Sequence, residues 1–266
     1  MKTVLCAMLS ILVFVTTISF SSCSNQEKDN NPIDSVTESE REEINEDETM
    51  SDKEDMPYKA IQVNTTFTDN MVLQRNKKVR VFGYGGNPGE TVRVKFHDKT
   101  YKGYIEEDGW EVWLDPMKAD KNGEVLEDIH RGKTVAFRNV VVGEVWLCSG
   151  QSNMAVSVQY ILNKDKSVKT EYSEYENWDS IRVYNRSFNK SGTPVIDSLI
   201  QDRWQTVSNF NNILNSSASA VAFALNLAHM LGDEVPVGVL NCSVGGSPIE
   251  SWISSEGMSG LRSYFE

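Results

Sequence analysis

The residues with the clearest chemical potential lie in the string GEVWLCSGQSNM, residues 143–154. The apolar run 145–148 predicts a strand that is buried on both faces of a parallel sheet. A Ser-Gly-Gln turn interrupts that run, and residues 153–162 then follow a helical period. This order presents the Ser152 hydroxyl at the carboxyl end of a strand, where open α/β sheets bind ligands. The pattern therefore predicts a serine nucleophile whose backbone N–H is free to stabilise an oxyanion.

A second strand end rich in glycine occurs later in the chain. Residues 217–231 predict an Ala-rich amphipathic helix, and residues 236–244 predict a second buried strand. This strand ends in Gly245 and Gly246, where the lack of side chains lets backbone N–H groups approach a ligand closely. A pair of glycines that serves only a turn is the alternative.

A serine nucleophile needs a base, usually a histidine that is oriented by a carboxylate. The sequence has three histidines. We expect His97 in a strand, His229 near the end of a helix, and His130 before the strand that leads to Ser152, each in a structural or exposed role. Asp128-x-His130 has the spacing of an acid–base pair. The base that Ser152 needs is not evident in these 266 residues.

The motifs together resemble those of the SGNH hydrolases, in the form found in sialate O-acetylesterases and related carbohydrate deacetylases. The Gly-Asp-Ser of that family corresponds here to Gly-Gln-Ser-Asn at 150–153. Residues 67–94 resemble the entry of the same proteins, and residues 217–231 and 235–254 resemble their next helix and second block. The resemblance extends over roughly residues 61–255, which makes chance similarity a poor explanation.

The resemblance implies a serine esterase that removes O-acetyl groups from sugars by two-step acyl transfer. Ser152 attacks the acetyl carbonyl, and the N–H groups of Ser152 and Gly245, with Gly246 as the neighbouring alternative, bind the oxyanion. Sialic acids are the first expected substrates, and acetylated xylan or other glycans are the second. No cofactor or metal is expected, and the sequence has no Cys/His cluster with ligand spacing.

The family places its catalytic Asp and His, and an oxyanion-binding Asn, in later blocks that this sequence lacks. Asp128-x-His130 precedes the nucleophile in the sequence, whereas the catalytic pair of the family follows it. We therefore expect a chain truncated at the C-terminus, with little or no esterase activity by itself. A noncatalytic, surface-anchored glycan-binding protein is the alternative from another functional class.

The expected fold class is multi-domain: a small antiparallel β-sandwich followed by an incomplete α/β doubly wound domain of the flavodoxin-like SGNH type. The sandwich is assigned to residues 58–142 because Val79 and Val81, and then Val92, Val94 and Phe96, alternate with polar residues. The α/β domain is assigned to residues 143–266.

The sequence also predicts the turns of the first domain and the position of its aromatic residues. Turn residues cluster at 83–90, 108–109 and 122–123. Three aromatic residues on the strands are expected to fill the core, with a sugar-stacking platform as the alternative; these are Tyr104, Trp110 and Trp113.

The N-terminus predicts export. Residues 1–23 have a charged start, an apolar middle and a small-residue end that resembles a bacterial lipoprotein signal with Cys23 as the lipidated residue. Cleavage without a lipid is the alternative. The predicted location is the bacterial outer membrane or periplasm, with a lipid anchor in the membrane.

Most of the net charge lies next to this signal. The chain has a formal charge of −12, and residues 24–57 contain thirteen acidic and three basic residues. This composition predicts a disordered acidic tether, with a solvated helix over 38–48 as the alternative. The remaining body is nearly neutral, which argues against nucleic acid as a partner.

Cys148 precedes the serine motif and Cys242 precedes the glycine pair. The family resemblance places their strands side by side. Export makes a disulfide possible, but neighbouring parallel strands rarely provide the required Cα separation, so we expect buried free thiols.

Overall fold

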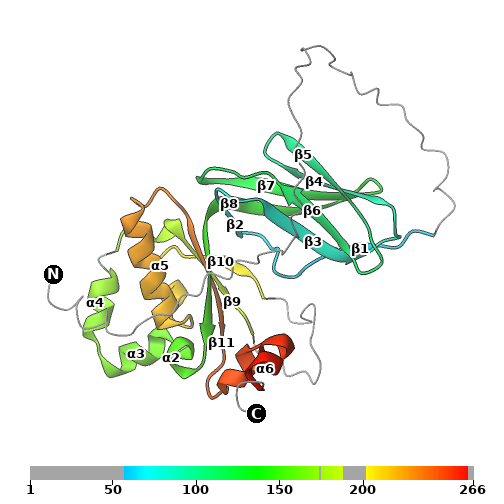
Figure 1. The fold of residues 1–266 in the computed structure, drawn as a ribbon. Coiled ribbons are helices and arrows are strands. Elements are labelled where there is room, and N and C mark those ends of the chain that lie inside the picture. The colour runs from blue at the N-terminus through cyan, green and yellow to red at the C-terminus, as the bar shows by residue number, and fades with distance from the viewer. Residues whose placement is uncertain (1–56, 174, 188–201, 263–266) are drawn as a thin grey trace, which may run out of the picture. The chain divides into compact units, whose positions relative to one another are not determined.

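The computed structural model describes residues 57–173, 175–187 and 202–262. The predicted signal, Cys23 and nearly all of the predicted tether lie outside the described residues. From Tyr58 onward the chain forms one compact unit of mixed, sheet-rich α/β structure (Figure 1). None of the helices in the described ranges has the length and apolar character needed to cross a membrane.

The first part of this unit is built from short strands in two sheets. One sheet has the order β1-β3-β6, and β4 pairs antiparallel with both β5 and β7. The bounds are β1 Ile61–Val63, β2 Val72–Gln74, β3 Val79–Gly85, β4 Thr91–Phe96, β5 Lys99–Tyr104, β6 Trp110–Leu114 and β7 Asp120–His130.

The alternating patterns are confirmed. Val79 and Val81 in β3, and Val92, Val94 and Phe96 in β4, are buried, whereas the residues between them are less buried or exposed. Period-two alternation sends one set of side chains to the core and the other outward, as expected for strands with one buried face.

The expected core position is right for Trp110 and wrong for Trp113 and Tyr104. Trp110 is 3% exposed, but Trp113 and Tyr104 are 49% and 57% exposed. Trp113 lies three residues after Trp110 on β6, so the alternation turns it to the opposite face. Its indole N–H donates to the Glu111 carboxylate across 2.9 Å, which satisfies the polar edge of the ring at the surface.

The turn predicted at Asn122-Gly123 is also wrong. Both residues lie inside β7, where the pairing with the next strand shifts register between Asp120 and Leu126. A Cβ on Gly123 would lie 2.1 Å from Asn139 Oδ1, so the glycine permits a close approach of two strands. An irregular strand pair thus takes the place of the hairpin turn that Asn-Gly favours.

Strand β8, Lys133–Gly150, connects the two halves of the unit. Its first part pairs antiparallel with β7, and residues 141–143 pair parallel with β2. The predicted division between residues 142 and 143 falls inside this strand. The two halves therefore share a continuous strand instead of being joined by a linker.

The second half holds the parallel part of an eight-stranded sheet, which runs in the order β10-β9-β11-β8-β7-β4-β5 with β2 beside β8. Strand β11, Val237–Ser243, pairs parallel with β8 on one side and with β9, Ile181–Asn185, on the other. Strand β10, Trp204–Thr206, adds antiparallel to β9. The predicted strands at 145–148 and 236–244 are therefore confirmed as direct neighbours.

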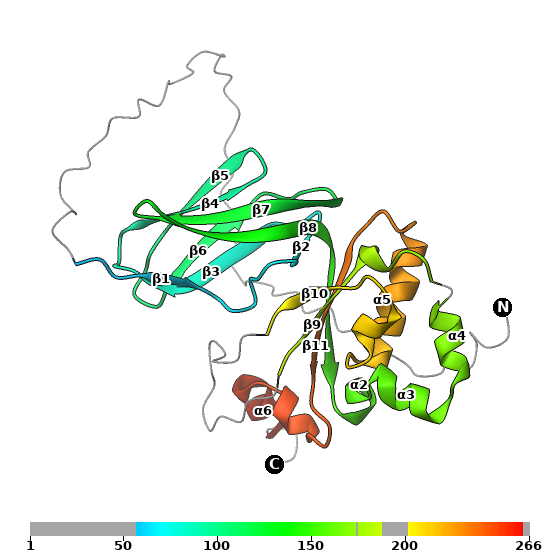
Figure 2. The same cartoon turned by 180° about the vertical axis from the view of Figure 1, so that it is seen from behind.

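The helices connect these strands. Their bounds are α2 Ser152–Ala155, α3 Val158–Lys164, α4 Ser167–Ser173, α5 Ala218–Met230 and α6 Ser255–Arg262, with 3-10 turns η1 Trp178–Ser180, η2 Phe210–Ile213 and η3 Ile249–Trp252. Helices α2 to α5 lie on one side of the sheet formed by β8, β9 and β11, as both views show (Figure 1 and Figure 2).

Two expectations about this half need correction. The helix predicted over 153–162 is broken into α2 and α3, because Ser157 is extended and its hydroxyl caps Tyr160 N. The strand at 145–148 is not buried on both faces, since Leu147 is 55% exposed while Cys148 is buried. The helix predicted over 217–231 is confirmed as α5, with Ser217 as its N-cap.

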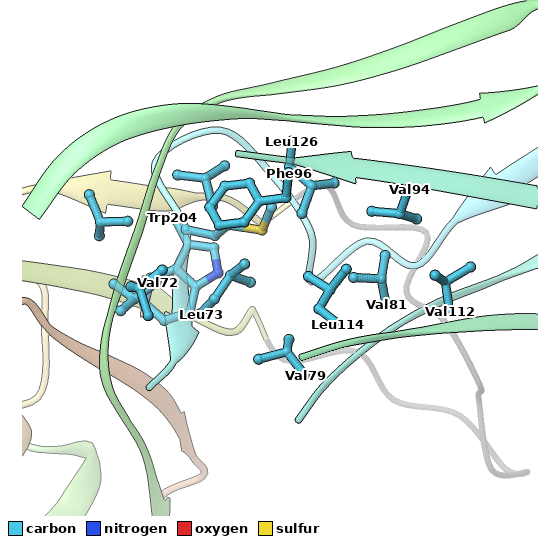
Figure 3. Close-up of a cluster of buried hydrophobic side chains, with 14 of the residues drawn as sticks. Val72, Leu73, Val79, Val81, Val94, Phe96, Val112, Leu114, Leu126 and Trp204 are labelled. Atoms are coloured by element: carbon cyan, nitrogen blue, oxygen red, sulfur yellow. The ribbon is translucent and has the colours of Figure 1, made fainter. Parts of the chain in front are cut away.

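Packing holds the two halves together. Trp204 of β10 is 4% exposed and joins the hydrophobic cluster of the first half, where it lies near Val72 and Leu73 (Figure 3). The buried guanidinium of Arg182 on β9 donates to the backbone carbonyl of Asn139. Burial lowers the pKa of Arg182 to about 10, and the group remains charged at neutral pH.

Candidate active site

Ser152 lies where the sequence predicts it. Strand β8 ends at Gly150, which adopts a φ of 143° that side chains rarely permit, and α2 begins at Ser152. The serine is exposed at the carboxyl end of the parallel strands. The predicted order of strand, glycine turn, serine and helix is thus present, and it leaves the hydroxyl accessible to a ligand.

The side chain of Gln151 contacts both reactive groups of the serine. Its Oε1 accepts from Ser152 N at 2.8 Å and from Ser152 Oγ at 2.7 Å. The amide oxygen therefore receives the hydroxyl proton and the backbone N–H together. The prediction that the Ser152 N–H is free is wrong in this structure, because the side chain of the preceding residue occupies that donor. Gln151 is itself exposed, so its side chain has room to rotate away.

Gly245 and Gly246 lie in a turn directly after β11. Ser247 N donates to Val244 O at 3.4 Å, and Gly246 has a φ of 77°, as the third residue of a type II turn requires. Val244 N donates to Gly150 O at 2.9 Å, which ties this turn to the end of β8. The two predicted blocks therefore meet at one edge of the sheet.

A row of polar side chains lies beneath this edge. Ser243 Oγ lies 2.6 Å from Asn241 Oδ1 and 3.2 Å from Met154 O, and its single proton serves one of these acceptors at a time. Asn241 Nδ2 donates to Asn185 Oδ1 at 3.3 Å, and Asn185 Nδ2 donates to Ser216 Oγ at 3.0 Å. This polar row links the ends of β9 and β11 to α2, which carries the serine.

The polar row is not among the features predicted from the sequence. Its signal was present in the polar residues that end two apolar strands, Asn185 in β9 and Asn241 with Ser243 in β11. Polar residues at the carboxyl ends of neighbouring parallel strands converge at one edge of a sheet. The strand β9 was not predicted, so this convergence could not be derived.

The three histidines have other positions. His130 is buried with its Nε2 2.6 Å from Glu90 Oε2, and His97 lies in the turn between β4 and β5 with its Nε2 3.9 Å from Asp120. His229 is exposed in the last turn of α5. The expectation that they are structural or exposed agrees with these positions, but the strand expected for His97 is wrong, because the chain turns there with a φ of 53°. His130 binds Glu90 and not its sequence neighbour Asp128.

Cys148 and Cys242 are free thiols. Cys148 is in register with Asn241, and Cys242 with Ser149, so the two cysteines point to opposite faces of the sheet. Burial raises the pKa of Cys148 to about 11 and also raises that of Cys242. Both side chains are therefore neutral thiols at physiological pH. Within the described ranges, no group of three or more His, Cys, Asp or Glu residues could hold a metal ion.

Comparisons with known proteins bear on this arrangement. Residues 142–264 match the family described as carbohydrate esterase, sialic acid-specific acetylesterase. The sialate O-acetylesterases of Pongo abelii and Homo sapiens are each 32% identical to this chain over 205 residues, and that of Mus musculus is 33% identical. These alignments cover 71% of this chain and 37–38% of the relatives.

A solved structure has a similar fold. A carbohydrate acetylesterase from Xanthomonas citri superimposes with a TM-score of 0.65 and 24% sequence identity, over 75% of this chain and 44% of that one. The chain thus spans less than half the length of the relatives to which it is similar.

The fold is that of a mixed, sheet-rich α/β protein similar to a carbohydrate acetylesterase. Residues 142–264, which contain the candidate active site, belong to the SGNH carbohydrate esterases of the sialic acid-specific acetylesterase type. The resemblance found in the sequence motifs is confirmed.

Proposed function

We propose that the complete protein is a serine esterase that removes O-acetyl groups from sugars, with sialic acids as its first substrates. The observation that carries the proposal is the exposed Ser152 at the end of β8, next to the glycine turn that Val244 ties to Gly150. Family membership and the sialate O-acetylesterase relatives support the substrate class.

The proposed reaction has two steps. Ser152 Oγ attacks the acetyl carbonyl carbon while a base takes its proton, and the sugar oxygen leaves with a proton from that base. Water then cleaves the acetyl-serine and releases acetate. In both steps the negative oxygen is held by the N–H of Ser152 and by that of Gly245, with Gly246 as the neighbouring alternative.

Gln151 has to move during this reaction. Its Oε1 accepts from the Ser152 N–H that we assign to the oxyanion. The substrate carbonyl oxygen can take this donor only after the amide has rotated away. The amide oxygen thus marks the position that we propose for the substrate oxygen.

The base is assigned to polypeptide outside these 266 residues. The three histidines of the sequence have other positions, and the Ser152 hydroxyl donates to Gln151. The family resemblance implies an Asp and a His in later blocks. The proposal therefore concerns the protein expressed from its complete reading frame.

The experiment measures acetate release from O-acetylated N-acetylneuraminic acid and from acetylated xylan. Ser152→Ala should reduce turnover by at least a factor of about 10³. Ser149→Ala is the matched control, because Ser149 is also exposed near the end of β8 and its hydroxyl donates to Cys242 O at 3.4 Å. Full activity of Ser152→Ala would refute the assignment, and glycan binding without hydrolysis by the unaltered protein would favour a binding protein.

We further propose the finer organisation that the sequence predicts. Residues 58–142 are assigned to an antiparallel β-sandwich and residues 143–266 to part of a doubly wound SGNH domain. An antiparallel network of strands in the first half and the parallel strands β8, β11 and β9 in the second support this assignment.

We also propose that residues 1–23 direct export and that Cys23 carries a lipid which anchors the protein in the bacterial outer membrane or at the periplasmic side. Residues 24–57 then form an acidic tether to the folded unit. Metabolic labelling with a palmitate analogue should label the protein, and Cys23→Ala should abolish the label. Equal labelling of both proteins would refute the anchor.

A further inference from the structure

An apolar pair projects from the 3-10 turn η3, which follows the glycine turn. Ile249 is 70% exposed and Trp252 is 38% exposed. A 3-10 helix repeats every three residues, so side chains at positions i and i+3 lie on the same side. Ile249 and Trp252 therefore present a joint apolar surface to solvent.

Hydrogen bonds hold the indole of Trp252 to the candidate active site. Its Nε1–H donates to Ser247 Oγ at 2.9 Å, and that hydroxyl donates to Val244 O at 2.8 Å. Val244 N in turn donates to Gly150 O, two residues before Ser152. Three successive hydrogen bonds thus connect the tryptophan to the strand end that positions the serine.

This anchoring fixes the polar edge of the ring and leaves ring surface exposed. The N–H of a tryptophan is its only donor, and here it is satisfied within the protein. A ring that is already oriented loses little conformational freedom when a ligand binds to it. An exposed and pre-oriented aromatic ring is suited to an apolar ligand surface and contributes little to the folded core.

We propose that Trp252, together with Ile249, forms a subsite for the sugar ring of the O-acetylated substrate. The proposal rests on the proposed function, since it places the acetyl group at Ser152 and the ring beside the glycine turn. A pyranose ring offers a face of C–H groups that packs on an aromatic surface, while its hydroxyls remain in water. Ile249 extends the apolar surface.

The experiment measures sugar binding in the absence of turnover. The protein from the complete reading frame carries Ser152→Ala, and the dissociation constant of O-acetylated N-acetylneuraminic acid is determined by calorimetry. Trp252→Leu removes the flat ring but keeps an apolar side chain, whereas Trp252→Phe keeps a flat ring. Trp113→Leu is the comparison variant, because Trp113 is similarly exposed on β6 in the other half and belongs to the sugar-stacking platform that the sequence leaves as the alternative.

The subsite predicts that Trp252→Leu weakens binding about tenfold, and that Trp252→Phe stays within about threefold of the parent. Trp113→Leu should leave the dissociation constant unchanged. The thermal unfolding temperature of each variant, compared with that of the Ser152→Ala parent, tests whether the substitution has left the fold intact.

Three results would overturn the subsite: equal binding by the leucine and phenylalanine variants at 252, an equal loss in Trp113→Leu, or no saturable binding by the Ser152→Ala protein. The proposed function is judged separately by acetate release with Ser152 intact. An active enzyme whose affinity does not depend on the ring at 252 would therefore refute the subsite alone.

Discussion

Asp128 is a buried carboxyl group whose ionisation should control the stability of the fold. It lies on β7 with 0% of its surface exposed, and neither of its oxygens has a hydrogen-bond partner in the part of the chain that the structure describes. Its neighbours in register are Val94 and Val135. Burial raises the pKa of Asp128 from 3.8 to about 7, because the charged form loses its hydration.

The size of the effect follows from this shift. The folded state binds the Asp128 proton more tightly than the unfolded state does. The contribution of this group to the free energy of unfolding is therefore complete below its pKa in the unfolded state, and it is lost as pH rises through its pKa in the folded state. A shift from 3.8 to about 7 corresponds to about 4 kcal/mol in total, of which about 3 kcal/mol is lost between pH 5 and pH 8. Asp128→Asn cannot ionise and should lose this component of the pH dependence.

The assay is urea unfolding at pH 5 and pH 8, with the free energy of unfolding extrapolated to water. We expect the difference between Asp128→Asn and the unaltered protein to grow by about 3 kcal/mol from pH 5 to pH 8, in favour of the variant. The Glu90–His130 pair is present in both proteins and cancels in this difference. Asp108→Asn is the control, because Asp108 is exposed in a turn.

The same pH dependence in Asp128→Asn and in the unaltered protein would refute a raised pKa of Asp128 as the cause. That result would mean that the Asp128 carboxylate is solvated or paired when charged. A control variant, Asp108→Asn, that reproduced the effect would equally remove Asp128 as its cause.

Further predictions concern packing, the polar row and the thiols. Gly143→Ala should lower the free energy of unfolding by at least about 3 kcal/mol, because the added Cβ would lie 1.9 Å from a backbone oxygen. Gly245→Ala places its Cβ in open space and should change the free energy of unfolding by less than about 0.5 kcal/mol. Chemical denaturation compares the two variants. Ser243→Ala should reduce acetate release more than Ser243→Thr does, because only threonine keeps the hydroxyl between Asn241 and Met154; equal rates would contradict a positioning role. Cys148 should react with iodoacetamide only after unfolding, and reductant should leave the intact mass unchanged; a gain of two protons would reveal a disulfide.

The local patterns that predict well are those governed by one strand or one helix. The alternation of Val92, Val94 and Phe96 needs only a single buried face, and Ser217 caps α5 as a local hydrogen bond. The turn before Ser152 follows from a glycine between an apolar run and a helical period. These features depend on residues close together in the sequence.

Features that depend on distant partners were predicted poorly. Strand pairing overrides the turn preference of Asn122-Gly123, because β8 pairs with β7 both before and after the register shift in which these two residues lie. The exposure of Leu147 was not predicted, because the pattern of a strand does not reveal which of its faces another element covers. The polar row under Ser152 depends on β9, whose place beside β11 is set by tertiary packing.

Covalent labelling of the nucleophile tests the central claim most directly. The protein from the complete reading frame is incubated with a fluorophosphonate, which loses fluoride and forms a stable phosphonate ester with an activated serine, and the adduct is located by peptide mass spectrometry. We predict a single adduct on Ser152, loss of acetate release in proportion to labelling, and no adduct in Ser152→Ala. An adduct on another residue that abolishes acetate release, with Ser152 unlabelled, would contradict the account.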